Sequence, residues 1–81
     1  MTVVRMLHQH EPPYGWHFSS PDLPGLVGGA DTYAEAKPHS ESAARFHLEC
    51  VAEEEGAPAP DFTDLEFQHF VPASEAPALA A

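Results

Sequence analysis

Six histidines are the residues whose chemistry first suggests a functional site in this 81-residue chain. His8 and His10 are two positions apart, so they share one face of the extended segment that contains them. His17 is expected to face them across a hairpin, and two or three imidazoles can bind zinc. However, neither a Cys-x-x-Cys nor a His-Glu-x-x-His motif accompanies them. The pattern favours ordinary surface or half-buried histidines, and we assign no metal ligand and no cofactor.

The candidate nucleophiles lack the neighbours that would activate them. Cys50 lies inside an expected helix, far from the helix N-terminus, and a buried or inert thiol is the favoured interpretation. Ser19 and Ser20 do not belong to a nucleophile-elbow motif. The glutamates at 53–55 are adjacent in sequence and are expected to be solvated, not to form an acid–base pair. We therefore assign no catalytic residue and expect no enzyme. A small metal-dependent enzyme that uses the histidines is the least favoured alternative.

Charge is a stronger signal than any of these groups. The net charge is −10, and residues 46–81 contain eight acidic residues and no lysine or arginine. Such a chain repels phosphate backbones, which disfavours direct nucleic-acid binding by this chain alone and favours a basic partner. A simply solvated acidic surface is the alternative. The candidate partner-binding residues are Glu49, Glu53, Glu54, Glu55, Asp61, Asp64 and Glu66.

Length and composition predict one small domain. A core of this size is marginal, so a homo-oligomer, a dimer or larger, is expected. The single cysteine cannot form an internal disulfide, which fits a reducing compartment. Neither a signal-peptide pattern nor a long apolar run is present, so we expect a soluble cytoplasmic protein without membrane contact.

Two strands are predicted at the start of the chain. Residues 2–10 alternate, with one face expected to carry Val4, Met6, His8 and His10. The prolines that follow Glu11 end this strand because proline removes a ladder donor. Residues 14–20 alternate as well, with the apolar face expected to carry Tyr14, Trp16 and Phe18.

The segment 20–32 joins these strands to a helix. Its two prolines and Gly25 are turn residues, and Leu26-Val27 leaves room for only a short third strand. Thr32 and Glu35 match a capping box. An apolar stripe at helical spacing follows, made of Tyr33, Ala36, Ser40, Ala43, Ala44, His47, Leu48 and Val51.

Pro38 conflicts with a regular helix at this point. It removes the amide that would donate to the carbonyl of Ala34, at a cost of about 3 kcal/mol. We therefore expect a distorted or broken first turn and a regular helix from about Ser40. Gly56 is expected to end the helix.

A last strand is predicted over residues 63–71, followed by a disordered tail at 72–81. Leu65, Phe67, His69 and Val71 are expected to share one face, and Glu66, Gln68 and Phe70 the other. The predicted fold class is α+β: a small, mainly antiparallel sheet with one helix packed on one face, in the order β-β-β-α-β, within a domain over residues 1–71.

The segment 16–36 resembles the HicB-like antitoxin domain family. The family's pattern is an aromatic strand, a Pro-Asp-Leu-Pro-Gly turn, and a Gly-x-Asp-Thr-x-x-Glu-Ala helix start. The residues that match its most specific positions are Pro21, Asp22, Leu23, Pro24, Gly25, Thr32 and Glu35. The resemblance spans about residues 3–71, and it implies a fold similar to a partial double-stranded-RNA-binding domain. It also implies an antitoxin of a type II toxin–antitoxin system, which binds and occludes a small basic mRNA-cleaving toxin.

The chain departs from the family's pattern at two places. Many members carry a C-terminal DNA-binding module, whereas only about ten low-complexity residues follow the last predicted strand here. Pro38 stands where the helix of the family continues. An orphan domain that acts as a homo-oligomeric scaffold or regulator without a toxin is therefore a second hypothesis.

Overall fold

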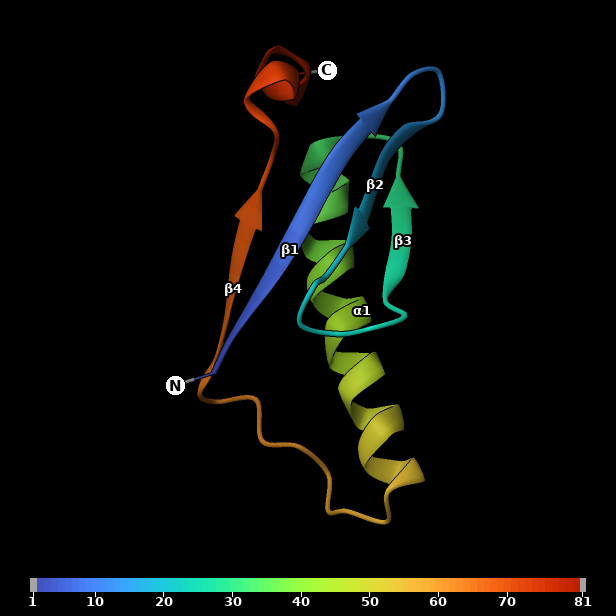
Figure 1. The fold of residues 1–81 in the computed structure, drawn as a ribbon, viewed down its shortest axis with the longest axis vertical. Helices are drawn as coiled ribbons and strands as arrows, with labels where there is room; N and C mark the ends of the chain where they lie inside the picture. Colours follow the sequence, from blue (N-terminus) through green and yellow to red (C-terminus); the bar gives the residue numbers. More distant parts are fainter. Residues whose placement is uncertain (1, 81) are drawn as a thin grey trace.

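The computed structural model describes residues 2–80 and folds as two layers, a four-stranded sheet and one long helix (Figure 1). This confirms the α+β class. The elements are β1 (Thr2–Glu11), β2 (Gly15–Ser19), β3 (Val27–Ala30), α1 (Tyr33–Glu54), β4 (Leu65–Phe70) and the 3₁₀ helix η1 (Ala73–Ala80). No helix in this part of the chain is long and apolar enough to cross a membrane.

The sheet is mixed, with the strand order β3-β2-β1-β4. The pairs β1–β2 and β2–β3 are antiparallel, whereas β4 runs parallel to β1, with Thr2 opposite Leu65 and Leu7 opposite Phe70. The sequence predicted a mainly antiparallel sheet, which describes two of the three pairs, but it did not predict the parallel pair at the edge. The reason is the helix: α1 carries the chain back along the sheet, so β4 must enter in the same direction as β3 and β1.

The alternation of β1 separates its two faces as expected, and the structure shows which of them is buried. Val4, Met6 and His8 are buried, while their neighbours in sequence face outward and are exposed. Trp16 and Phe18 are 3% exposed and complete this side of the core.

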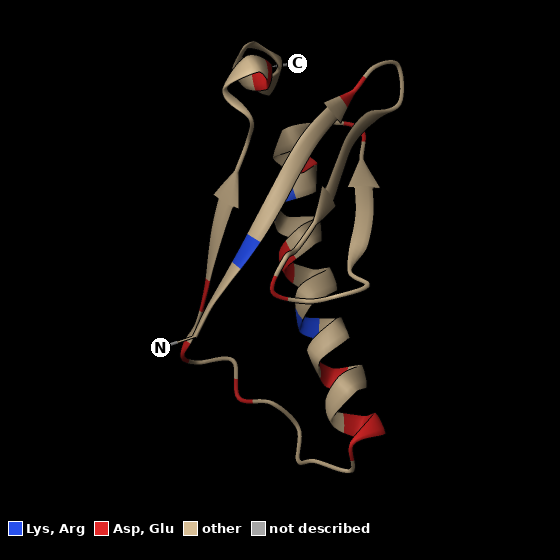
Figure 2. Cartoon of the chain, viewed as in Figure 1, with Lys and Arg blue, Asp and Glu red and all other residues tan. Residues whose placement is uncertain are grey.

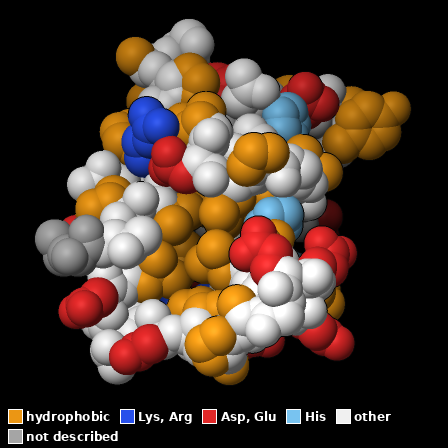
Figure 3. Space-filling view, turned by 60° about the horizontal axis from the view of Figure 1, so that its bottom comes forward, with side chains coloured by type: hydrophobic (Ala, Val, Ile, Leu, Met, Phe, Trp, Pro, Cys, Tyr) orange, Lys and Arg blue, Asp and Glu red, His pale blue; other side chains and the backbone are white. Residues whose placement is uncertain are grey.

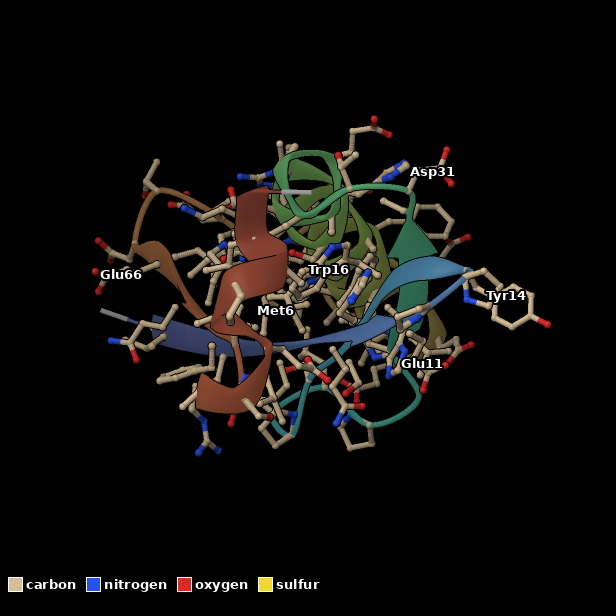
Figure 4. The ribbon with its side chains drawn as sticks, turned by 90° about the horizontal axis from the view of Figure 1, so that it is seen from above. Met6, Glu11, Tyr14, Trp16, Asp31 and Glu66 are labelled. Atoms are coloured by element: carbon tan, nitrogen blue, oxygen red, sulfur yellow. The ribbon has the colours of Figure 1, made fainter. Side chains whose placement is uncertain are left out.

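Tyr14 does not share that face, contrary to the expectation. Its side chain is 84% exposed and projects from the hairpin, while Met6 and Trp16 lie between the sheet and the helix (Figure 4). The reason is that β2 begins only at Gly15, and Tyr14 belongs to the turn, where its amide donates to the carbonyl of Glu11 at 2.7 Å.

The third strand is short, as expected, and it includes Gly28 and Gly29. A Cβ on Gly28 would lie 2.5 Å from the Phe18 ring, and one on Gly29 would lie 2.8 Å from the Trp16 carbonyl oxygen. Only glycine therefore allows β3 to approach β2 this closely.

The helix begins where the capping box predicts. Thr32 is its N-cap, and its hydroxyl accepts a hydrogen bond from the Glu35 amide at 3.2 Å. The expected break near Pro38 is wrong, because α1 is continuous from Tyr33 to Glu54. Pro38 has no amide to donate to the Ala34 carbonyl. Both residues are exposed, so water can donate to this carbonyl instead.

The helix ends at Gly56 as expected. Gly56 has a φ of +68°, and two backbone bonds close a Schellman motif: Gly56 to the Glu53 carbonyl at 3.2 Å, and Ala57 to the Ala52 carbonyl at 2.8 Å.

Residues 73–80, assigned from sequence to a disordered tail, form η1 in the structure. Two contacts hold it beside the end of β1. The Glu75 carboxylate accepts from the His10 amide at 2.9 Å, and Ala78 packs against the core. The bond between Glu75 and His10 joins residues 65 positions apart, so local composition does not reveal it.

Candidate functional site

The seven acidic residues predicted to bind a partner are all exposed and lie toward one end of the molecule (Figure 2). They belong to the last turns of α1, its C-cap, the loop that follows, and the start of β4. Within residues 2–80, none of the seven forms an ion pair. The seven side chains, proposed from the sequence as one set, therefore lie on three consecutive segments of the structure: α1 with its C-cap, the loop, and β4.

The basic residues do not neutralise this acidic end. Arg5 pairs with Asp22 at 2.8 Å, and Arg45 lies 3.8 Å from Glu41 while its guanidinium stacks over the Phe67 ring. Lys37 lies near the opposite end of the helix. The acidic end keeps a negative potential that attracts cationic groups.

Asp61 has the clearest local reason to stay ionised. Its carboxylate accepts hydrogen bonds from the amide and the hydroxyl of Thr63, at 2.9 Å and 2.8 Å. These bonds lower the pKa of Asp61, the backbone bond most of all.

Hydrophobic surface lies among the acidic groups. Figure 3 shows hydrophobic side chains on the floor of a hollow, with acidic side chains around it. An open depression of about 300 Å³ also lies between the end of α1 and the following loop. It is lined by Glu49, Ala52, Glu53, Ala57, Ala59 and Pro60. Apolar floor beside unpaired carboxylates suits a ligand that presents both apolar and cationic groups.

The length of the helix explains why this end is open. α1 has 22 residues and packs mainly on β2 and β3, which have five and four residues. At about 1.5 Å per helical residue and 3.3 Å per strand residue, the helix is roughly twice as long as these strands. Its last turns therefore extend beyond them, and Phe46 is 68% exposed.

The structure also forms a hydrogen-bonded network of three side chains, His8, His69 and Glu41, that sequence reasoning missed. His8 Nε2 lies 2.9 Å from His69 Nδ1, and His69 Nε2 lies 2.7 Å from Glu41 Oε2. The carboxylate can only accept, so His69 donates through Nε2. In its neutral form His69 then accepts from His8 through Nδ1. Alternation groups His8 and His69 with the residues that share a face of their own strands, but no local pattern relates Glu41 to either histidine.

The inner end of this network, at His8, is closed to solvent. His8 is fully buried, and its Nδ1 has no hydrogen-bond partner among the described residues. Burial lowers the pKa of His8 to about 4, with further contributions from His69 and Lys37. The neutral form of His8 is therefore the one that fits the core. The network of His8, His69 and Glu41 links β1 and β4 to α1.

The other histidines do not gather into a site. Gln9 stands opposite His17 in the sheet, so His17 faces outward, where it bonds to the Gln9 side chain at 2.8 Å. His8 and His10 lie on the other side of the sheet. Over residues 2–80, no group of three or more His, Cys, Asp or Glu side chains is placed to hold a metal ion.

The turn residues that carry the family resemblance have structural roles. Asp22 accepts from the Arg5 amide at 2.8 Å and from its guanidinium at 2.8 and 3.1 Å, and these bonds lower the pKa of Asp22 to about 2. Leu23 is buried in the core, and Gly25 has a φ of +88°. The motif therefore joins β2 to β3 and fixes the turn to β1.

Comparison with known proteins adds no further assignment. No family model, no curated protein and no solved structure matches the chain.

Proposed function

We propose that this protein is a non-enzymatic interaction domain whose acidic end binds a small basic protein. The observation that carries the proposal is the set of seven exposed carboxylates, unpaired within residues 2–80, beside apolar surface. Clustered carboxylates raise the local concentration of a cationic partner, and apolar contacts beside them lengthen the lifetime of the complex.

The partner that fits this surface best is a small basic mRNA-cleaving toxin. A ribonuclease must present cationic groups to RNA phosphates, and the carboxylates of this domain would occupy the same groups. The resemblance of residues 16–36 to HicB-like antitoxins supports this choice, as does the chain order β-β-β-α-β. The domain would act in the cytoplasm by covering the RNA-binding surface of the toxin.

A second candidate function, a homo-oligomeric scaffold or regulator without a toxin, is favoured by the outer face of the sheet. No element within residues 2–80 covers this face, and Leu7 and Phe70 lie opposite each other on it, 41% and 45% exposed. Exposed apolar pairs of this kind are common at contacts between subunits.

The direct experiment is a pull-down with this chain as bait, identification of any captured small basic protein by mass spectrometry, and an RNA-cleavage assay of that protein with and without the chain. We expect a complex that suppresses cleavage and weakens as salt is raised. Changing Glu53, Glu54 and Glu55 together to Gln should weaken binding about tenfold or more and flatten the salt dependence.

The matched control removes three charges at the other end of the molecule. Glu11→Gln, Asp31→Asn and Glu35→Gln, in one variant, should leave the affinity nearly unchanged, since Figure 4 shows Glu11 and Asp31 away from Glu66. Equal losses of affinity in both variants would show that binding depends on the net charge of the chain and not on the position of the carboxylates. No loss in either would refute the acidic end as the binding surface.

A further inference from the structure

The free edge of β4 is the feature that carries an inference beyond the proposed function. β4 is the last strand of the sheet, and Figure 1 shows no element of residues 2–80 beyond it. Its sequence, Leu-Glu-Phe-Gln-His-Phe, contains no lysine or proline, the residues that commonly block such an edge.

The register of β4 shows which of its backbone groups are unused. The Thr2 amide donates to the Asp64 carbonyl at 2.9 Å, and Thr2 stands opposite Leu65. In a parallel ladder, this means that residues 64, 66, 68 and 70 bond to β1. The backbone groups of Leu65, Phe67 and His69 therefore point away from the sheet.

Among residues 2–80, local structure satisfies one of these outward groups. The Leu65 amide donates to the Phe62 carbonyl at 3.1 Å. The Leu65 carbonyl and both backbone groups of Phe67 and of His69 are left for an extended partner. They are spaced two residues apart, as a sheet ladder requires.

We propose that β4 pairs with β4 of a second copy of this chain, antiparallel and around a two-fold axis at Phe67. Phe67 would then exchange both of its backbone bonds with Phe67 of the second copy, and His69 would pair with Leu65. The four-stranded sheets of the two copies become one eight-stranded sheet, and both helices lie on the same face of it.

Side-chain pairing favours this register and a second copy as the occupant. Glu66 stands opposite Gln68 on the outer face, so no like charges meet, and Phe67 meets its own equivalent on the inner face. A two-fold axis at Gln68 would instead set the charged Glu66 against Phe70. The strand is thus complementary to itself, as an isologous interface requires.

This inference is independent of the basic partner. Glu66 on β4 belongs to both surfaces. Apart from this residue, the dimer uses the backbone edge of β4, whereas partner binding uses the carboxylates and the apolar surface at the end of α1. A monomeric chain that still bound the basic partner would refute the pairing alone, and a dimer without such a partner would refute the proposed function alone.

The test is the mass of the full chain in solution, by light scattering or sedimentation over a concentration series. Moderate salt should be present, because it screens the repulsion between two acidic chains. We expect a dimer whose Phe67 and His69 amides become protected from hydrogen exchange as concentration rises. A monomer at every concentration, or a dimer in which these amides stay unprotected, would overturn the proposal.

Two substitutions at the exposed Gln68 test the register. Gln68→Glu places like charges opposite Glu66 of the other copy, twice per dimer, and should weaken the dimer about fivefold. Gln68→Lys places opposite charges there and should strengthen it by a similar factor. The control is Gln9→Glu on the central strand β1, which adds the same charge on the same face and should have little effect.

Each other outcome is decisive as well. If Gln68→Glu and Gln68→Lys both weaken the dimer, Gln68 faces its own equivalent and the axis at Phe67 is wrong. If neither changes it, or if Gln9→Glu weakens it as much as Gln68→Glu does, β4 is not the interface.

Discussion

His8 is the residue whose environment differs most from what its chemistry ordinarily prefers. It is an ionisable side chain with no exposed surface, and burial lowers its pKa to about 4 from an ordinary value of 6.5. Its neighbours are imidazole on β4, aromatic rings on β2 and α1, and the more distant cation of Lys37. None of these can stabilise a proton on Nδ1.

The depressed pKa makes folding stability depend on pH in a defined direction. Between pH 6.5 and 4 the unfolded chain binds a proton at His8 and the folded chain does not. Stability from this group is therefore complete above pH 6.5 and is lost as pH falls toward 4, by up to about 3 kcal/mol.

Urea unfolding at several pH values, compared between the wild type and His8→Leu, checks this. The difference in unfolding free energy between the two proteins should shift in favour of the variant as pH falls through this window. The exposed His39 serves as a control, because His39→Gln should leave the pH profile unchanged. If the unfolding free energies of the wild type and His8→Leu change with pH in parallel, the pKa of His8 is not lowered in the folded protein.

At the scale of elements, α1 decides both the topology and the position of the acidic end. Its capping residues and its Schellman end are local features, and both form as the sequence indicates. Local sequence does not explain why the helix continues through Pro38. Tertiary packing does, because Ala36, Ser40 and Ala44 are buried on both sides of the proline.

Because the helix continues through Pro38, that proline should lower the stability of the folded chain. Pro38→Ala restores an amide donor toward the Ala34 carbonyl and is expected to raise the free energy of unfolding by about 1 to 3 kcal/mol. Thermal or urea unfolding measures this. Ser42→Ala, at an exposed position of the same helix, should change it by only a few tenths. Equal effects of the two substitutions would argue that the first turns of the helix form only weakly.

At the scale of the whole molecule, an excess of ten negative charges on 81 residues opposes compaction. The repulsion is concentrated where the glutamates at 53–55 stand at the negative end of the helix dipole. Such an arrangement is unfavourable for the isolated chain and becomes favourable when a cationic partner binds.

The isolated chain should therefore become more stable as salt is added. Raising sodium chloride from low concentration to about 0.5 M should raise the unfolding midpoint, since the Debye length falls below the spacing of the charges. The variant with Gln at 53, 54 and 55 should start from a higher midpoint and respond less. A midpoint that is insensitive to salt in the wild type would show that the carboxylates are too far apart to repel one another.

The sequence by itself determined the features that depend on neighbours in the chain. Alternation predicted which residues share a face on β1 and on β4, helical spacing predicted the half-buried stripe of α1, and Thr32 and Gly56 predicted its ends. The same reasoning identified the acidic set but not its geometry. These features follow from periodicity and backbone geometry, which act over a few residues.

Only the tertiary structure decided how distant segments meet. The parallel pairing of β4 with β1, the exposure of Tyr14, and the chain from Glu41 through His69 to His8 join residues that no local pattern relates. The physical reason is the path of α1: a helix that runs back along the sheet fixes the direction of β4. That direction brings His69 beside His8, and it leaves the backbone of Phe67 at a free edge.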